Sequence, residues 1–408
     1  MKYEIIKLQD VVDKLGDGLH GTPIYDNNGE YYFINGNNLD DGKIVFKENT
    51  KKVSREEYHK YKKDLNDRTI LVSINGTLGN VAVYKNEKVM LGKSACYFNV
   101  IENVNKDYIK YVIMSPDFKK YLEQHYTGTT IKNVSLKTMR NYTFKLPSEN
   151  HQLFVSKILS SLDSKIELNN QIISNLEELA STLFKRWFVD FEFPDENGNP
   201  YKSSGGKMVD SELGKIPEGW ELRTLGYFSE IIMGQSPKGE SYNNDNSGLP
   251  LLNGASDFKN GIISPLKYTT EPKKVTQKGD FIFGVRATVG HVTESDGIYA
   301  IGRGTGLART KNYYAKEFLY FSLKNIIRYL ELTASGSVYV NISKKELNDF
   351  KLIYPANRIL QLFHRTTVNL FKEKMNKYIE NQFLTELRDS LLPKLLSGEI
   401  ELPEDEEV

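Results

Sequence analysis

The second half of this sequence repeats the first, so the chain must fold as two copies of one unit. The segment TGTTIKNVSLKTMRNYTFKLP, which begins at Thr127, aligns with ASGSVYVNISKKELNDFKLIYP, which begins at Ala334. Two shorter segments align in the same order along the chain: ILVSINGTLGNVAV with FIFGVRATVGHVTE, and INGNNLDDGKI with LNGASDFKNGI. A solenoid requires about three or more repeats, so two copies indicate a pseudo-two-fold molecule instead.

Each copy opens with a region of short β-branched and aromatic runs that Gly and Asn interrupt, as strands and turns are. FIFGVRATVGHV is typical, because its apolar residues alternate and its glycines fall where a hairpin would turn. Short helical stretches interrupt these runs, such as DYIKYVIMSPDFKKYLEQHY from Asp107. This mixture favours an α+β fold over a doubly wound parallel sheet.

Each copy closes with a long helix. No Pro or Gly occurs from His151 to Trp187, a stretch that would span roughly 55 Å at about 1.5 Å per residue. Apolar residues recur every seven positions in two columns: Leu159, Ile166, Ile173, Ala180 and Trp187, then Leu162, Asn169, Leu176 and Leu183. This heptad pattern is typical of a helix packed lengthwise on another helix. We therefore predict that the two long helices pack together and set a distance between the two domains.

The heptads of the second helix are less regular. Its better column is Leu370, Lys377, Leu384 and Leu391, with Lys377 at the position of the polar break that Asn169 makes in the first helix. Its other column holds the polar residues Thr367, Lys374 and Asn381. We therefore expect the second column to be shifted onto Phe371 and Tyr378.

These patterns divide the chain into five parts. Residues 1–150 form the first α+β domain, and 151–193 form the first long helix and its end. Residues 194–219 are rich in Pro, Gly, Ser and charge, which is typical of a surface linker. Residues 220–357 form the second α+β domain, and 358–408 form the second long helix and a C-terminal tail.

Composition bounds the class of protein. A single cysteine, Cys96, excludes an internal disulfide and a cysteine-based zinc site. Apolar runs are too short for a membrane helix, and MKYEIIKLQD is too polar for a signal peptide, so a cytoplasmic protein is expected. The net charge is +1, but both α+β domains are mildly basic and both helical parts are mildly acidic. A basic domain that occurs twice is consistent with nucleic-acid binding.

Signatures of catalysis are not evident. GDGLHG, from Gly16 to Gly21, fits the dinucleotide-binding spacing, but a turn-rich segment follows it instead of a helix. The six histidines are scattered without metal-ligand spacing. We expect no catalytic residue and no metal on this chain.

Three segments carry a family resemblance. LASTLFKRWFVDFEFP from Leu179 ends the first helix, SELGKIPEGWELRTLG from Ser211 opens the second copy, and LRDSLLPKLLSGEIEL from Leu387 ends the second helix. Each segment resembles a signature of the specificity subunits of type I restriction–modification systems. Together the three segments cover that architecture from end to end, although the first domain begins at Lys2 without the N-terminal extension of some relatives.

The resemblance implies a DNA-binding scaffold. Each α+β domain would be a target-recognition domain that reads one half of a split, asymmetric DNA sequence. The two long helices would lie antiparallel as a coiled-coil spacer. Two modification subunits would dock on these helices and supply S-adenosylmethionine and adenine methylation. Restriction subunits, which are motor-nucleases, would add ATP and magnesium. The chain itself would bind no cofactor and would be non-catalytic.

Candidate DNA-binding residues follow from the chemistry of base and phosphate contact, which uses Asn, Arg, Ser and Thr on loops together with Lys and Arg. In the first copy they are Ser73, Asn75 and Thr77 of the hairpin, and Thr127, Thr129, Thr130, Lys132 and Asn133 of the repeated polar loop. In the second copy they are Arg286, Thr288, Arg303, Ser335, Ser337, Tyr339 and Asn341. Structural turns are the alternative for both hairpins, and Ser343 with Glu346 forms a helix-capping pattern.

The helix ends are apolar. The first helix ends with Phe184, Trp187, Phe188 and Phe191, and the second with Leu391, Leu392, Leu395 and Leu396. These residues either form the core of the helix junction or make an interface for a modification subunit.

Other classes of protein remain possible from the sequence. One is the specificity subunit of another multi-subunit restriction system, or a stand-alone two-headed DNA-binding protein. Another is a methyltransferase or nuclease with an unfamiliar site, and a third is a purely structural protein. Methylation or cleavage by the purified chain would identify an enzyme, and the absence of sequence preference on DNA would identify a structural protein.

Overall fold

The computed structural model describes residues 3–259, 261–285, 291–333 and 342–400. The chain forms two compact units. Unit 1 consists of Met1–Leu168 and Gln382–Val408, and unit 2 consists of Asn169–Asn381. The two long helices are α5 (Glu149–Phe188) and α9 (Asn357–Ser397), and each contributes one section to unit 1 and another to unit 2. Within the described ranges, none of the helices has the length and apolar character needed to cross a membrane.

Unit 1 contains a four-stranded antiparallel sheet in the order β2-β10-β7-β8. Its strands are β2 (Val12–Asp17), β10 (Ala95–Val100), β7 (Thr69–Ser73) and β8 (Val81–Val83). A smaller sheet orders β6 (Lys52–Val53), β3 (Tyr31–Ile34) and β9 (Val89–Leu91), with β3 and β9 parallel. The first strand, β1 (Glu4–Lys7), pairs with β11 (Thr143–Leu146). The helices are α1 (Arg55–Tyr61), α2 (Lys106–Met114), α3 (Pro116–His125) and α4 (Leu136–Arg140).

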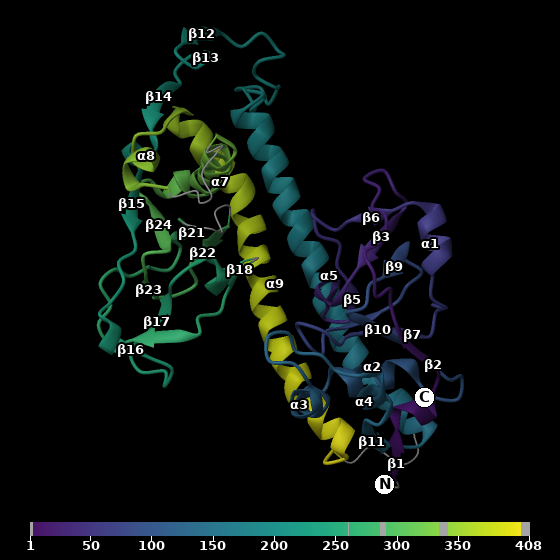
Figure 1. The fold of residues 1–408 in the computed structure, drawn as a ribbon. Coiled ribbons are helices and arrows are strands. Elements are labelled where there is room, and N and C mark those ends of the chain that lie inside the picture. The colour runs from purple at the N-terminus through teal and green to yellow at the C-terminus, as the bar shows by residue number, and fades with distance from the viewer. Residues whose placement is uncertain (1–2, 260, 286–290, 334–341, 401–408) are drawn as a thin grey trace. The chain divides into compact units, whose positions relative to one another are not determined.

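Unit 2 repeats this topology (Figure 1). Its main sheet has the order β15-β24-β21-β22, with β15 (Ser229–Met233), β24 (Thr305–Thr310), β21 (Phe281–Gly284) and β22 (Val292–Glu294). A second sheet holds β16 (Tyr242–Asn243), β20 (Lys267–Thr269), β17 (Leu249–Leu252) and β23 (Ala300–Ile301), with β17 and β23 parallel. A short pair joins β18 (Phe258–Lys259) to β19 (Ile262–Ile263). The strand β14 (Glu221–Thr224) pairs with β25 (Lys351–Tyr354). The helices are α6 (Leu225–Phe228), α7 (Lys316–Thr333) and α8 (Lys344–Asn348).

The internal repeat is confirmed at the level of single hydrogen bonds. In unit 1 the backbone N–H of Val134 donates to the carbonyl of Ile74 at 2.8 Å, and in unit 2 that of Ile342 donates to Val285 at 3.2 Å. Ser135 caps α4, and Ser343 caps α8 in a capping box with Glu346, as expected. The predicted α+β class is also confirmed, because helices and mainly antiparallel sheets are mixed in both units.

Each unit buries its own core. In unit 1 the inward faces of β7 and β10 pack on α2 and α3, with Phe98, Tyr108 and Phe118 fully buried. In unit 2 the β21 and β24 strands pack on α7, and Phe281, Phe283 and Phe318 occupy the corresponding interior. These aromatic side chains explain how such short strands can form a core, because each ring buries a large apolar area.

The predicted seam of α5 is confirmed at most positions. Leu159, Asn169, Ile173, Ala180 and Trp187 are buried, at the heptad spacing read from the sequence. The remaining members of the two columns are half-buried, among them Leu162, Leu176 and Leu183. In both units a section of α5 lies antiparallel beside a section of α9, as predicted (Figure 1).

The seam of α9 differs from the better column read from the sequence, although Phe371 is buried as the shifted register required. Thr367 and Asn381 are also buried, whereas Leu370, Leu384 and Leu391 are only half-buried. Each polar seam residue has a partner: the Thr367 hydroxyl donates to the carbonyl of Phe363, and Asn381 accepts a hydrogen bond from Asn169 at 2.9 Å. Buried Asn pairs fix the register of paired helices, so Asn381, and not Lys377, is the partner of the Asn169 break.

The segment predicted as a linker is largely ordered. Its second half forms a hairpin of β12 (Met208–Ser211) and β13 (Gly214–Pro217). The ring of Phe193 stacks on Tyr201 at 4.5 Å and on Trp220 at 4.9 Å between centroids. Aromatic stacking therefore stabilises a stretch whose Gly, Ser and charge content is typical of a flexible linker.

Candidate nucleic-acid interface

The two candidate loops of unit 1 form one surface. The turn after β7 and the loop after α3 are joined by backbone hydrogen bonds from Gly76 to the carbonyl of Lys132 and from Val134 to that of Ile74. The side-chain amide of Asn75 donates to the Asn133 Oδ1 atom at 3.1 Å. We call these two segments, residues 74–77 and 127–133, the loop pair.

The loop after α3 is closed on itself at its base. Thr127 and Asn133 exchange two backbone hydrogen bonds of 2.8 Å each. Gly128 has a φ of +92°, and a Cβ at this position would lie 2.4 Å from the Ile131 carbonyl oxygen, so the turn requires glycine. This closure holds the tip of the loop away from the core, and the predicted residues Thr127, Thr129, Thr130, Lys132 and Asn133 are all exposed there.

Thr77 is also exposed in the loop pair, and Asn75 is half-buried. Ser73 differs from these residues, because it is fully buried and its hydroxyl accepts a hydrogen bond from the backbone of Asn80 at 2.8 Å. This burial favours the structural alternative for Ser73, whose hydroxyl stabilises the turn, over a DNA contact. Ser73 is the last residue of β7, in which every residue is buried, so an alternation of inward and outward residues could not be used to place it.

The loop pair carries the chemistry that DNA binding requires. The Lys132 ammonium lies 4.8 Å from the centre of the Tyr126 ring, which supports the long side chain at the surface. Ile131 is 60% exposed beside it, a large apolar side chain that the sequence analysis did not single out. Hydroxyls, an amide, a cation and apolar groups together match the contacts that proteins make to phosphates and base edges.

The corresponding loops of unit 2 are anchored by the Ile342–Val285 hydrogen bond. The candidate residues between these anchors lie outside the described residues: Arg286, Thr288, Ser335, Ser337, Tyr339 and Asn341. Arg303 is exposed in the turn before β24, where it stays a candidate. Arg309, a nearby arginine on β24, donates two hydrogen bonds to the buried Asp280 carboxylate at 2.9 and 2.8 Å.

The apolar helix ends are core residues. Phe184, Trp187, Phe188 and Phe191 are at most 8% exposed and pack within unit 2. Leu392 and Leu395 are buried in unit 1, and Leu391 and Leu396 pack against the same core. This burial favours core packing over docking as the role of these residues, although Leu391 and Leu396 are only half-buried.

An exposed apolar pair occurs elsewhere on α9. Phe383 is 66% exposed and Leu387 is 46% exposed, and their spacing of four places them on one face of the helix. Both residues are apolar in the sequence, but they belong to neither heptad column, so the heptad pattern does not identify them.

Two α+β units of one topology, each built on paired long helices, define the class of this protein as a duplicated binding scaffold. A model of the type I restriction modification DNA specificity domain matches residues 1–178 and 217–381. The chain therefore belongs to the family of type I restriction–modification DNA specificity proteins, and its function is that of the specificity subunit.

Individual relatives agree with this assignment. The chain is 29% identical over 375 residues to the inferred type I restriction enzyme MjaX specificity subunit of Methanocaldococcus jannaschii. This alignment covers 86% of this chain and 83% of the relative. It is 27% identical over 353 residues to the MjaIX specificity subunit of the same organism, in an alignment that covers 82% of this chain and 78% of that relative. It is 26% identical over 344 residues to the HindI specificity subunit of Haemophilus influenzae, in an alignment that covers 70% of this chain and 74% of that relative.

The fold is also similar to a solved structure. The crystal structure of the type I restriction–modification system S subunit from M. genitalium matches with a TM-score of 0.56 at 18% identity. The match covers 97% of this chain and 96% of that chain.

Proposed function

We propose that this chain reads a bipartite, asymmetric DNA sequence, with one half-site bound by each recognition domain. The observation that carries this proposal is the loop pair of unit 1, in which two polar segments far apart in the sequence form one exposed surface. The recurrence of the framework hydrogen bond in unit 2 supports a second reader of the same design. Because the two loops differ in sequence, the two half-sites are expected to differ.

Methylation sequencing of DNA exposed to the reconstituted complex tests this function. We expect two unlike half-sequences at a fixed separation. A palindromic or an uninterrupted target would contradict the proposal that the two domains read different sequences.

Base and phosphate contacts in the loop pair can be separated by mutation. Asn133→Ala is expected to weaken binding by roughly 1–3 kcal/mol at one base position and to relax the target there. Lys132→Ala is expected to weaken binding to all sequences and to reduce the slope of log affinity against log salt by about 1. Binding titrations of the complex at several salt concentrations measure both effects.

Matched controls lie just outside the loop pair. Lys137→Ala and Asn141→Ala remove exposed side chains of the same types on or beside α4, and both variants should bind like the unmodified protein. If these controls weaken binding as much as the loop variants, the loop pair is not the reading surface.

We further propose that the chain is non-catalytic and acts in the cytoplasm with two modification subunits and with restriction subunits. S-adenosylmethionine, ATP and magnesium would be bound by those partners and not by this chain. The support is the family assignment together with the exposed apolar residues Phe383 and Leu387, which offer a docking face on α9.

Docking at this face predicts that Phe383→Ala lowers the affinity for the modification subunit by about 2 kcal/mol, because exposed aromatic residues commonly dominate interfaces. Leu387→Ala should have a smaller effect in the same direction. The control is Leu153→Ala on α5, which removes a similarly exposed leucine of unit 1. Calorimetric titration with the modification subunit measures the three affinities, and equal affinities for all three variants would rule out this docking face.

A further inference from the structure

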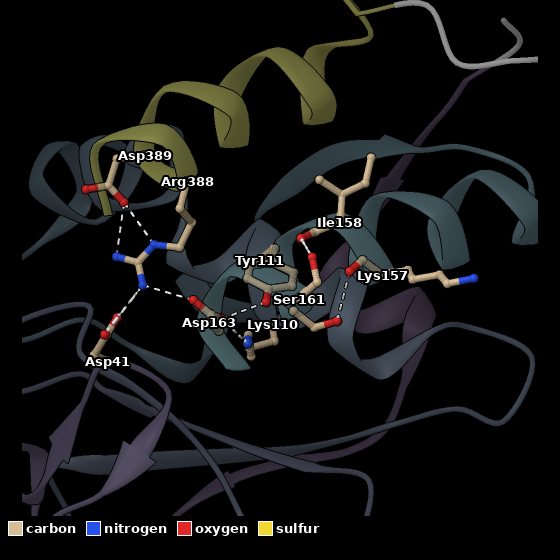
Figure 2. Close-up of polar contacts among 10 residues, drawn as sticks. Asp41, Lys110, Tyr111, Lys157, Ile158, Ser161, Asp163, Arg388 and Asp389 are labelled. Carbon is tan, nitrogen blue, oxygen red and sulfur yellow. Dashed lines mark hydrogen bonds and ion pairs between the residues drawn. The ribbon is translucent and has the colours of Figure 1, made fainter. Parts of the chain in front are cut away.

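In unit 1 one carboxylate joins the recognition domain to both long helices. Asp163 of α5 accepts hydrogen bonds from the Tyr111 hydroxyl at 2.6 Å and from the Lys110 ammonium at 2.9 Å, both on α2. Arg388 of α9 donates to the other Asp163 oxygen at 3.0 Å. It also donates to Asp41 at 3.2 Å, in the turn between β4 (Leu39–Asp40) and β5 (Lys43–Ile44). Figure 2 shows these side chains converging on Asp163 from separate elements. We call this group the Asp163 cluster.

Unit 2 contains the same chemistry. Glu177 of α5 accepts hydrogen bonds from the Tyr320 hydroxyl at 2.8 Å and from the Lys324 ammonium at 2.7 Å, both on α7. Lys374 of α9 donates to the second Glu177 oxygen at 2.6 Å. In this Glu177 cluster, as in the Asp163 cluster, one α5 carboxylate binds a tyrosine and a lysine of the recognition domain and a cation of α9.

The gene duplication does not account for this similarity. At the offset that aligns Gly128 with Gly336, the position of Asp163 corresponds to Phe371 and that of Glu177 to Thr385. Both carboxylates therefore lie on α5, at positions that the repeat does not relate. The same arrangement arises in each unit from non-equivalent residues, which indicates a shared requirement.

Stability alone is a weak explanation for these clusters. The charged groups are largely covered, since Lys110 and Arg388 are 12% exposed and Lys374 is 13% exposed, and desolvation offsets much of the attraction between such charges. Apolar residues would pack the same contacts at no desolvation penalty. Charge-assisted hydrogen bonds differ from apolar contacts in being directional, so three of them on one carboxylate fix the orientation of three elements.

We propose that Asp163 and Glu177 are positioning residues for DNA recognition, each of which holds its recognition domain at one orientation on the helical spacer. This inference rests on the proposed reading of split half-sites. A reader held at one orientation accepts one separation between half-sites, because each added base pair moves a half-site by about 3.4 Å and rotates it around the DNA axis by about a tenth of a turn. The clusters thereby set how strictly the complex measures that separation.

The test uses the complete complex of this chain with its modification subunits and a set of DNA targets. Each target carries both half-sequences, separated by the natural spacing or by one or two base pairs more or fewer. We expect Asp163→Asn and Glu177→Gln each to raise methylation at the neighbouring spacings, relative to the natural one, by about tenfold, a usual size for coupling between sites. The bases preferred within each half-site should stay unchanged.

Glu178→Gln is the matched control. Glu178 lines the same cleft of about 650 Å³ as Glu177, is exposed, and makes no hydrogen bond or ion pair among the described residues. It should retain the spacing profile of the unmodified complex. If an Asn or Gln variant does not fold, Tyr111→Phe or Tyr320→Phe removes a single hydroxyl from the cluster, and a smaller broadening is then expected.

Several outcomes would overturn this inference. An unchanged spacing profile in folded variants would do so, and so would methylation that falls by one factor at every spacing, which would indicate a purely structural role. A change in the preferred bases at constant spacing would also count against it. If the unmodified complex methylates no split target at any spacing, the proposed function itself fails, and that result is recognised before any variant is compared.

Discussion

Replacing Phe188 by alanine is expected to lower the free energy of unfolding by about 3–5 kcal/mol, the usual range for a buried aromatic residue. Phe188 is 6% exposed, and its ring lies 4.8 Å from those of Phe318 and Phe363 in edge-on contacts. It also lies 5.9 Å from Trp220, which opens the second recognition domain. Alanine would remove these aromatic contacts and leave a cavity among rigid rings, which cannot collapse to fill it.

The adjacent Val189 provides the control, because it is 52% exposed and its replacement by alanine should change stability by less than about 0.5 kcal/mol. Urea unfolding followed by circular dichroism measures both variants. A Phe188→Ala protein of normal stability that no longer binds the modification subunit would favour the docking interpretation of this helix end.

The recognition domains illustrate what the sequence can predict. The alignment of Gly128 with Gly336 correctly anticipated two units of one topology, because the repeat preserves framework residues such as Ser135 and Ser343. It also placed the polar loop on the surface. It could not show that the loop pairs with the turn at Gly76, since that contact depends on backbone hydrogen bonds between segments distant in sequence.

The long helices show what the sequence cannot predict about side-chain burial. On α5 the seam is largely apolar, so its spacing is visible in the sequence, from Leu159 to Trp187. On α9 the seam includes Thr367, Lys374 and Asn381, which are polar residues that a hydrophobic pattern assigns to solvent. Their burial is possible only because Asn169 and Glu177 of α5 supply partners to two of them. A pattern within one helix does not contain this information.

Acidification is expected to weaken unit 2 through Glu177. Burial by itself raises the pKa of this carboxyl group, but Lys374 and Lys324 outweigh that effect and lower the pKa to about 2 from an ordinary value of 4.5. The folded state therefore holds the proton less tightly than the unfolded chain. The resulting stabilisation is complete above about pH 5 and is lost as the pH falls through 4.5 toward 2. At about 1.4 kcal/mol per pKa unit, it amounts to about 3 kcal/mol.

Glu177→Gln should remove this contribution, because the amide carries no charge and leaves Lys324 and Lys374 without a carboxylate between them. At pH 7 the variant is expected to be less stable by about 3 kcal/mol, and the difference should shrink steadily between pH 5 and pH 3. Glu178→Gln removes an exposed charge from the neighbouring residue and should follow the unmodified protein at every pH. Urea unfolding at a series of pH values measures the three curves. A constant difference between Glu177→Gln and the unmodified protein would show that packing, and not the charge of Glu177, stabilises this junction, whereas convergence at low pH would identify the carboxylate as the group that joins α7 to the two long helices.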